Sequence, residues 1–234
     1  CLSVSIGNLS DETALFIDNC AMTLPLPDHL SEPEEVTGRW AYEFQTERRS
    51  IGRAAYVREN WTGRSSHHMN PTLTLLEKAT STTHGDALGV HLGWSGNHQL
   101  RIESLADGRR MLQAGELLRP GEIALAPGAH YTSPSLYLCH SSAGQNGLTR
   151  QWHQMIRREF IASQNPVSTR RPVQLNTWEA LYFGVDEPSV LALMDQAAPL
   201  GIERFVLDDG WFLGRADDQR ALGDWEVVRS IRGV

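Results

Sequence analysis

The chain has 234 residues, of which 41% are hydrophobic and 21% are charged, and its formal net charge is −7. This composition is ordinary for a globular protein and allows one large domain or two smaller ones. The negative charge and the lack of a basic stripe argue against a nucleic-acid partner. No apolar run approaches the roughly 18 residues that would predict a membrane span.

The three cysteines, Cys1, Cys20 and Cys139, are widely spaced and form no Cys-x-x-Cys pair. A scattered, odd set predicts neither a disulfide framework nor a zinc site, so we expect reduced thiols in a cytoplasmic protein. No signal peptide is visible. The chain begins with Cys1 and stops at Val234, and we expect both ends to be truncated.

Residues 1–145 are predicted to form an all-β domain. Every second residue from Leu88 to Trp94 is apolar, which is the period of a strand with one buried face. Asp107–Gly108 is a hairpin signal, and residues 119–122 (RPGE) predict a further turn. Turns at this spacing favour a β-sandwich.

The periodicity changes after residue 147. Residues 141–147 are small and polar and predict a domain boundary. The following apolar residues lie on one face of an amphipathic helix that runs to about Ala162: Leu148, Trp152, Met155, Ile156 and Phe160. Residues 163–172 are polar and contain proline, so residues 146–172 are interpreted as a helical connector and linker.

Residues 173–234 show a different pattern of predicted elements, in which strands alternate with a helix. Residues 173–178 and 204–207 are predicted strands, and the helix between them has Asp186 as its N-cap and Gly201 at its end. Strand, helix and strand within about 35 residues predict a βαβ unit with a parallel sheet. The apolar run 205–207 suggests a strand buried on both faces.

Two carboxylates, Asp208 and Asp209, follow the second of these strands directly. Ligands of α/β proteins bind at the carboxyl ends of strands. Carboxylates accept hydrogen bonds from vicinal hydroxyls, and an indole covers the apolar face of a sugar ring, so a sugar site is one interpretation. The alternative is a plain Asp-Asp-Gly turn with Gly210 at positive φ.

Three motifs resemble the α-galactosidases of glycoside hydrolase family 36. The longest spans VLDDGWF at 206–212, GRADD at 214–218 and LGDW at 222–225. The segment NTWEALYF at 176–183 resembles the first barrel-strand motif of that family, and GRSSHHMNP at 63–71 resembles a motif of its N-terminal domain. The resemblance runs from about Ala41 to the last residue.

The resemblance implies an N-terminal β-supersandwich followed by a (β/α)8 TIM barrel that stops after its second strand. It implies a retaining α-galactosidase that hydrolyses terminal α-D-galactosyl residues of oligosaccharides such as melibiose and raffinose, with no cofactor and commonly as a homotetramer. Asp208 and Asp209 would bind the galactose hydroxyls. Trp178 would pack beside the sugar or in a core, and Trp225, with Asp224, would close the pocket or anchor its loop.

The catalytic residues are expected to lie outside this chain. The resemblance places the nucleophile in a Lys-Trp-Asp motif that is absent here, and the acid/base farther on, so the fragment alone is expected to be inactive. A galactosyl transferase, an α-N-acetylgalactosaminidase and a non-catalytic carbohydrate-binding β-domain remain alternatives. His67 and His68 have no carboxylate at ligand spacing, so we expect no metal site.

Overall fold

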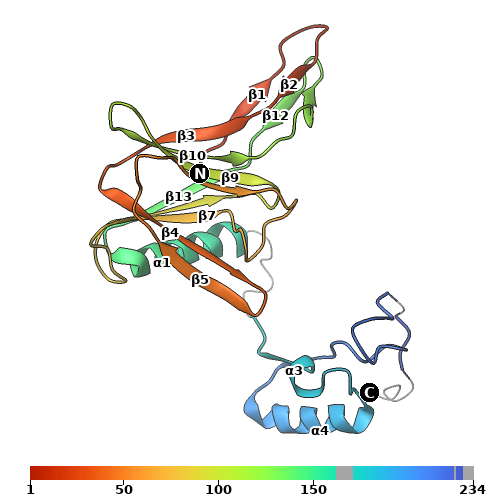
Figure 1. Ribbon diagram of the computed structural model, residues 1–234. Coiled ribbons are helices and arrows are strands. Elements are labelled where there is room, and N and C mark those ends of the chain that lie inside the picture. The colour runs from red at the N-terminus through yellow and green to blue at the C-terminus, as the bar shows by residue number, and fades with distance from the viewer. Residues whose placement is uncertain (162–170, 224, 229–234) are drawn as a thin grey trace. The chain divides into compact units, whose positions relative to one another are not determined.

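The computed structural model describes residues 1–161, 171–223 and 225–228 (Figure 1). The chain divides into two compact units, Cys1–Phe160 and Ile161–Val234, and each is described by itself. Most of the predicted linker at 163–172 lies outside the described residues, and so does Asp224.

The first unit is built mainly from strands. They are β1 (Ser5–Gly7), β2 (Leu15–Ile17), β3 (Cys20–Leu26), β4 (Leu30–Arg39), β5 (Tyr42–Arg48), β6 (Tyr56–Asn60), β7 (Thr72–Glu77), β8 (Ala87–Leu92), β9 (His98–Ser104), β10 (Arg110–Glu116), β11 (Ile123–Leu125), β12 (His130–Thr132) and β13 (Leu136–Ser141). β3-β10-β9-β6 form a four-stranded sheet and β13-β8-β7-β4-β5 a five-stranded sheet, both antiparallel.

One apolar core is shared by the two sheets. Leu100, Ile102 and Leu112 enter it from the four-stranded sheet, and Leu75 and Val90 enter it from the five-stranded sheet. Each fully buried side chain of this size stabilises the fold by about 1.5–3 kcal/mol. The apolar residues of the alternation predicted along β8 therefore face this core.

The structure confirms one predicted turn and shortens one predicted strand. Asp107–Gly108 connects β9 to β10 as predicted, and Gly108 adopts a φ of +89°. The predicted strand through Trp94 ends earlier, because β8 stops at Leu92, and Trp94 is 40% exposed.

Two small strand pairs, β1-β12 and β2-β11, extend from the sheets and bury Ile17 in a second apolar cluster (Figure 1).

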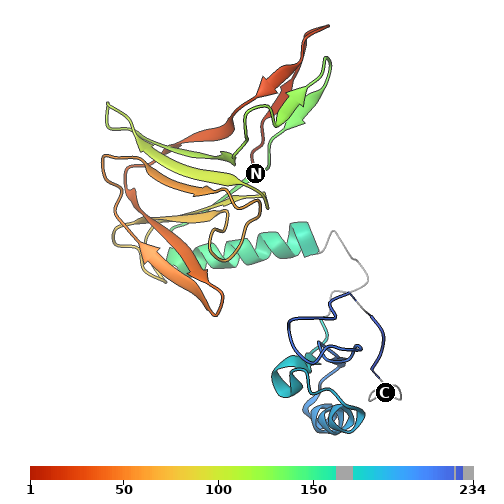
Figure 2. The same cartoon turned by 45° about the vertical axis from the view of Figure 1, so that its right-hand side comes forward.

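A helix covers the outer face of the five-stranded sheet (Figure 2). α1 (Gly144–Met155) continues as a π-helix (Ile156–Ile161). The helix begins earlier than predicted, because its first turn includes Gly144 and Gly147. Gly144 adopts a φ of +65° and packs so closely against Ser81 that a side chain would collide. Small polar residues have a low helix propensity, so the sequence did not predict that the helix starts at Gly144.

The second unit contains a single βαβ unit. Its elements are β14 (Gln174–Asn176), α3 (Trp178–Leu181), α4 (Glu187–Ala197), a 3₁₀ turn (Ala198–Leu200) and β15 (Arg204–Val206). β14 and β15 pair in parallel, as predicted. In the described ranges, no helix has the length and apolar character that a membrane crossing requires.

The predicted helix signals of this unit are confirmed at both ends. The side chain of Asp186 accepts a hydrogen bond from the backbone N–H of Ser189 at 2.8 Å, and that bond lowers the pKa of the Asp186 carboxyl. Gly201 follows the helix in the left-handed conformation, at φ +83°. β15 is only half-buried, because a two-stranded sheet covers little of either face.

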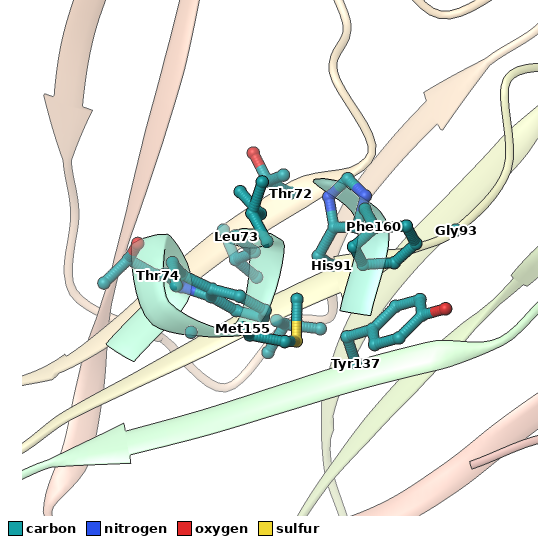
Figure 3. A pocket seen from close by; sticks show the side chains of 12 residues that line it. Thr72, Leu73, Thr74, His91, Gly93, Tyr137, Met155 and Phe160 are labelled. Atoms are coloured by element: carbon teal, nitrogen blue, oxygen red, sulfur yellow. The ribbon is translucent and has the colours of Figure 1, made fainter. Parts of the chain in front are cut away.

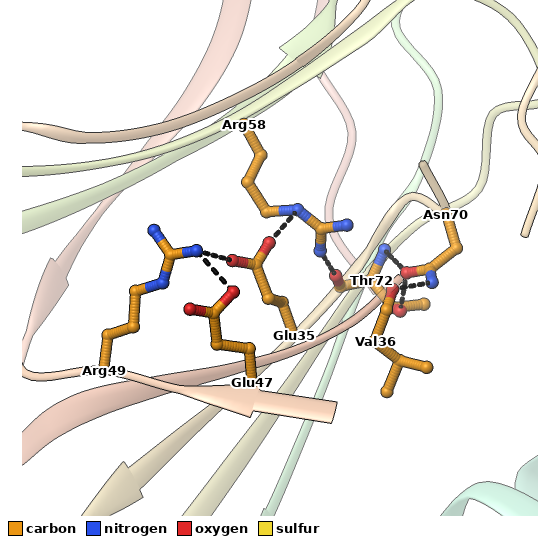
Figure 4. A network of polar contacts seen from close by, with 7 residues as sticks. All are labelled: Glu35, Val36, Glu47, Arg49, Arg58, Asn70 and Thr72. Carbon is orange, nitrogen blue, oxygen red and sulfur yellow. Dashed lines mark hydrogen bonds and ion pairs between the residues drawn. The ribbon is translucent and has the colours of Figure 1, made fainter. Parts of the chain in front are cut away.

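A buried ion pair links the two sheets of the first unit (Figure 4). Glu35 lies on β4 of one sheet and Arg58 on β6 of the other, with Oε2 and Nε 2.8 Å apart. Arg58 also donates to the carbonyl of Thr72 on β7 at 2.8 Å. Arg58 is 5% exposed and Glu35 is 9% exposed, so this pair is formed away from water.

Replacement of Arg58 by methionine is expected to lower the free energy of unfolding by about 3–5 kcal/mol, because it leaves Glu35 buried without its closest partner. Urea unfolding of the 234-residue chain, followed by far-UV circular dichroism, measures the loss. The matched control is Arg109→Met, which removes an exposed pair with Asp107 and should change stability by less than about 0.5 kcal/mol. Equal urea midpoints for the two variants would contradict the prediction.

Candidate functional site

The carboxyl ends of β14 and β15 lie side by side in the second unit. Asn176 pairs with Val206 in the parallel register, and the backbone N–H of Thr177 donates to the carbonyl of Val206 at 3.0 Å. The residues that follow each strand therefore meet at one edge of the sheet. These are Asn176 and Thr177 on one side, and Asp208 and Asp209 on the other.

Asp208 is fixed by neighbours from both strands. Its Oδ2 accepts a hydrogen bond from the amide of Asn176 at 2.6 Å, and its backbone N–H donates to Oγ1 of the buried Thr177 at 2.9 Å. Oδ1 of Asp208 accepts from the backbone N–H of Asp209 at 2.8 Å. The side chain of Asp208 is thus directed toward β14.

Asp209 is held by a different partner. Arg215 donates to its Oδ2 from Nη2 at 2.8 Å and from Nε at 3.3 Å. Nη1 of Arg215 donates to the carbonyl of Arg220 at 2.8 Å, and the Arg215 residue is 7% exposed. The two adjacent aspartates therefore engage separate partners, because neighbouring residues of an extended chain point to opposite sides.

Trp178 belongs to an aromatic cluster at the end of β14. Its ring meets Tyr182 at 5.2 Å and Phe183 at 5.0 Å between centroids, both edge to face. The predicted strand through Trp178 is wrong in its last two residues, because β14 ends at Asn176 and Trp178 begins α3. The side-chain Oδ1 of Asn176 accepts from the backbone N–H of Trp178 at 2.7 Å, which turns the chain into this helix.

Trp225 belongs to a second aromatic cluster. It stacks on Trp211 at 6.1 Å and meets the buried Phe212 at 5.1 Å, while 64% of its surface stays exposed. An antiparallel bridge between Phe212 and Val227 holds the two segments together. Trp225 therefore anchors its loop and still presents an indole face to solvent.

Arg215 lies between these two clusters. Its guanidinium carbon is 5.4 Å from the ring centroid of Phe183 and 5.9 Å from that of Phe212. Phe183 contacts Trp178, and Phe212 contacts Trp225. One buried guanidinium thus connects Asp209 with both aromatic groups.

A separate cavity of about 530 Å³ lies in the first unit, between the outer face of the five-stranded sheet and the end of the helix (Figure 3). His91, Tyr137, Trp152 and Phe160 contribute rings to its wall, and its lining among the described residues includes no Asp, Glu, Lys or Arg. Burial lowers the pKa of His91. Trp152 packs on the sheet here, as predicted, because Gly89 has no side chain to displace it.

The described residues include no group of three or more His, Cys, Asp or Glu side chains that could hold a metal ion. The rings of His67 and His68 lie against each other, with centroids 4.6 Å apart.

Two family models match successive parts of the chain, and the second match begins within the first compact unit. Residues 1–126 match the model described as "Glycosyl hydrolase family 36 N-terminal domain", and residues 130–232 match the model described as "Melibiase". The chain thus comprises a β-rich N-terminal domain and the start of a glycosidase catalytic domain. It belongs to glycoside hydrolase family 36.

Named relatives are similar over most of the chain. An α-galactosidase of Escherichia coli is 45% identical over 209 residues, which cover 89% of this chain and 29% of that protein. The α-galactosidase Mel36A of Lactobacillus acidophilus is 33% identical over 227 residues, which cover 97% of this chain and 31% of that protein.

Solved structures match at similar identity. An α-galactosidase from Lactobacillus brevis superposes with a TM-score of 0.84 at 32% identity, covering 97% of this chain and 31% of that one. A variant of AgaA from Geobacillus stearothermophilus, solved with stachyose, gives a TM-score of 0.82 at 30% identity, covering 97% of this chain and 32% of that one. The chain spans about a third or less of the length of each of these relatives.

Sequence reasoning singled out Asp208, Asp209, Trp178 and Trp225 but missed the residues that hold them. Asn176 and Arg215 both lie inside the recognised motifs, yet only the folded chain brings them to the carboxylates. The signal that could have revealed Arg215 is a lone arginine between aromatic and acidic residues. Such a residue commonly pairs with a nearby carboxylate.

Thr177→Val is expected to weaken the end of β15, because the backbone N–H of Asp208 loses its buried acceptor. The local free energy of opening should fall by about 1–3 kcal/mol. Hydrogen exchange of peptides covering residues 204–210 measures this effect as faster deuterium uptake. Thr46→Val, at an exposed position on β5, is the matched control, and equal uptake in both variants would refute the prediction.

Proposed function

We propose that residues 1–234 are part of a retaining α-galactosidase that hydrolyses terminal α-D-galactosyl residues of oligosaccharides such as melibiose and raffinose. The observation that carries the proposal is the pair Asp208 and Asp209 at the carboxyl end of β15, each held by its own hydrogen-bond partner, Asn176 and Arg215. The names of the relatives support it, and so does the AgaA variant that was solved with stachyose.

Carboxylates in this arrangement suit a neutral sugar. Each oxygen has two lone pairs, so a carboxylate already bound by one partner can still accept from a hydroxyl. Asp208 and Asp209 together would accept hydrogen bonds from vicinal hydroxyls of galactose. Trp178 and Trp225 would cover the apolar C–H face of the ring.

Hydrolysis itself requires two further carboxyl groups. A retaining glycosidase needs a nucleophile and an acid/base about 5–5.5 Å apart on opposite sides of the scissile bond. Asp208 and Asp209 are consecutive and already bound to each other through the N–H of Asp209, so they cannot flank that bond. The proposal therefore places both catalytic aspartates outside residues 1–234 and involves no cofactor.

The domain organisation is part of the same proposal. Residues 1–145 form a β-supersandwich, residues 146–172 a helical connector and linker, and residues 173–234 the start of a (β/α)8 barrel. The core shared by two sheets supports the first assignment, and the parallel pair β14-β15 supports the last. The enzyme would act as a homo-oligomer, as a tetramer, in the cytoplasm, with its three thiols reduced.

The alternative of a carbohydrate-binding β-domain is disfavoured by the aromatic side chains of the first unit. The exposed Trp40, Tyr42 and Phe44 lie at the hairpin of β4 and β5, whereas Trp61 and Trp94 follow β6 and β8. These exposed aromatic residues are therefore dispersed over three places. The cavity beside Trp152 is lined mainly by apolar groups, which do not match the hydroxyls of a sugar.

Asp209→Asn, made in the complete reading frame that contains these residues, is expected to lower kcat/KM for p-nitrophenyl α-galactoside about 100-fold, because an amide replaces a charged acceptor. The matched control is Asp107→Asn in the exposed turn between β9 and β10, which should retain activity. Circular dichroism verifies that both variants fold. Unchanged kcat/KM in Asp209→Asn would exclude this residue from the sugar site.

The purified 234-residue chain is expected to release no p-nitrophenol from the same substrate, because it lacks the two catalytic carboxyl groups. The complete protein, assayed in parallel at equal concentration, is the positive control. Turnover by the 234-residue chain would place a catalytic pair within it and overturn the proposed division of the site.

A further inference from the structure

Arg215 approaches Asp209 in a way that leaves one carboxylate oxygen available. Both donors, Nη2 and Nε, converge on Oδ2 of Asp209, at 2.8 and 3.3 Å. Oδ1 of Asp209 has no hydrogen-bond partner among the described residues, and 28% of the Asp209 side chain is exposed. A carboxylate held by one oxygen presents the other in a fixed direction.

We propose that Arg215 is a positioning residue of the sugar site, which holds Asp209 so that Oδ1 accepts a hydrogen bond from a galactose hydroxyl. This inference rests on the function proposed above. Arg215 itself is too deeply buried to reach a sugar, so its effect passes through Asp209.

The guanidinium is well suited to this task because it is itself fixed. Its Nη1 donates to the carbonyl of Arg220 at 2.8 Å, and its carbon lies over the rings of Phe183 and Phe212. A planar guanidinium can make these contacts together, whereas a lysine ammonium is a flexible point charge. Asp209 is therefore attached to a rigid group and not to a mobile surface cation.

The charge of Arg215 serves a second purpose. Asp208 and Asp209 place two carboxylates side by side, and Arg215 brings the opposite charge to within 2.8 Å of one of them. The site then carries a single net negative charge from these three residues, which suits a neutral ligand rich in hydroxyl donors.

The aromatic clusters support this role of Arg215. Phe183 packs on Trp178 and Phe212 packs on Trp225, so the two rings beside the guanidinium are themselves held in place. A guanidinium between two such rings keeps the direction in which it holds Asp209.

The test uses the complete reading frame with Arg215→Met, Arg215→Lys and the matched control Arg220→Met. Arg220 pairs with Asp217 on the exposed side of the same loop, and only its backbone carbonyl touches Arg215. We expect kcat/KM for p-nitrophenyl α-galactoside to fall about 100-fold in Arg215→Met and about tenfold in Arg215→Lys, with Arg220→Met unchanged.

Binding is measured separately as the inhibition constant of free galactose, a neutral probe. It should rise in both Arg215 variants by a factor similar to the rise in KM. The double variant Arg215→Met with Asp209→Asn should lose little beyond Asp209→Asn alone, because the arginine acts through that carboxylate. A merely structural role for Arg215 would give independent, multiplying losses.

The outcomes separate the two proposals. An inactive wild-type protein would refute the proposed function itself. An active wild type in which Arg215→Lys behaves like Arg220→Met, or in which the Arg215 and Asp209 losses multiply, would overturn the positioning role alone. Arg215→Lys keeps the test decisive if Arg215→Met does not fold.

Discussion

The parallel pairing of β14 with β15 is the constraint on which the candidate site depends. It brings Asn176 within 2.6 Å of Asp208, although the two residues are 32 positions apart in the chain. Parallel strands need a crossover, and α4 supplies it with Val190 buried against Val185. Asp186, which caps α4, therefore contributes to the site indirectly, by fixing where the crossover begins.

The site separates two similar carboxylates by giving each its own partner. The carboxylate of Asp208 accepts a hydrogen bond from the neutral Asn176 amide, while that of Asp209 faces the charged Arg215. A buried arginine is stable here because it has a carboxylate, a carbonyl and two aromatic faces around it. This network gives two adjacent side chains defined and different directions at a strand end.

The first unit depends on a different constraint, because two sheets must stay aligned with each other over one core. Apolar side chains supply most of the free energy but little direction. Arg58 links the two sheets through its ion pair with Glu35 and its hydrogen bond to the carbonyl of Thr72. Gly89 lets the indole of Trp152 lie directly on the sheet surface. Small and charged residues thus fix contacts that hydrophobic burial alone leaves open.

The sequence by itself determined the features that depend on near neighbours. These are the alternation along β8, the turn at Asp107–Gly108, the cap at Asp186 and the left-handed Gly201. The motifs around Asp208 also indicated the family. The start of α1 at Gly144 and the end of β14 at Asn176 were not predicted, because local propensities there favour other structures. Only the tertiary structure decided that Asn176 holds Asp208 and Arg215 holds Asp209, because hydrogen-bond partners are selected by distance in space and not by separation along the chain.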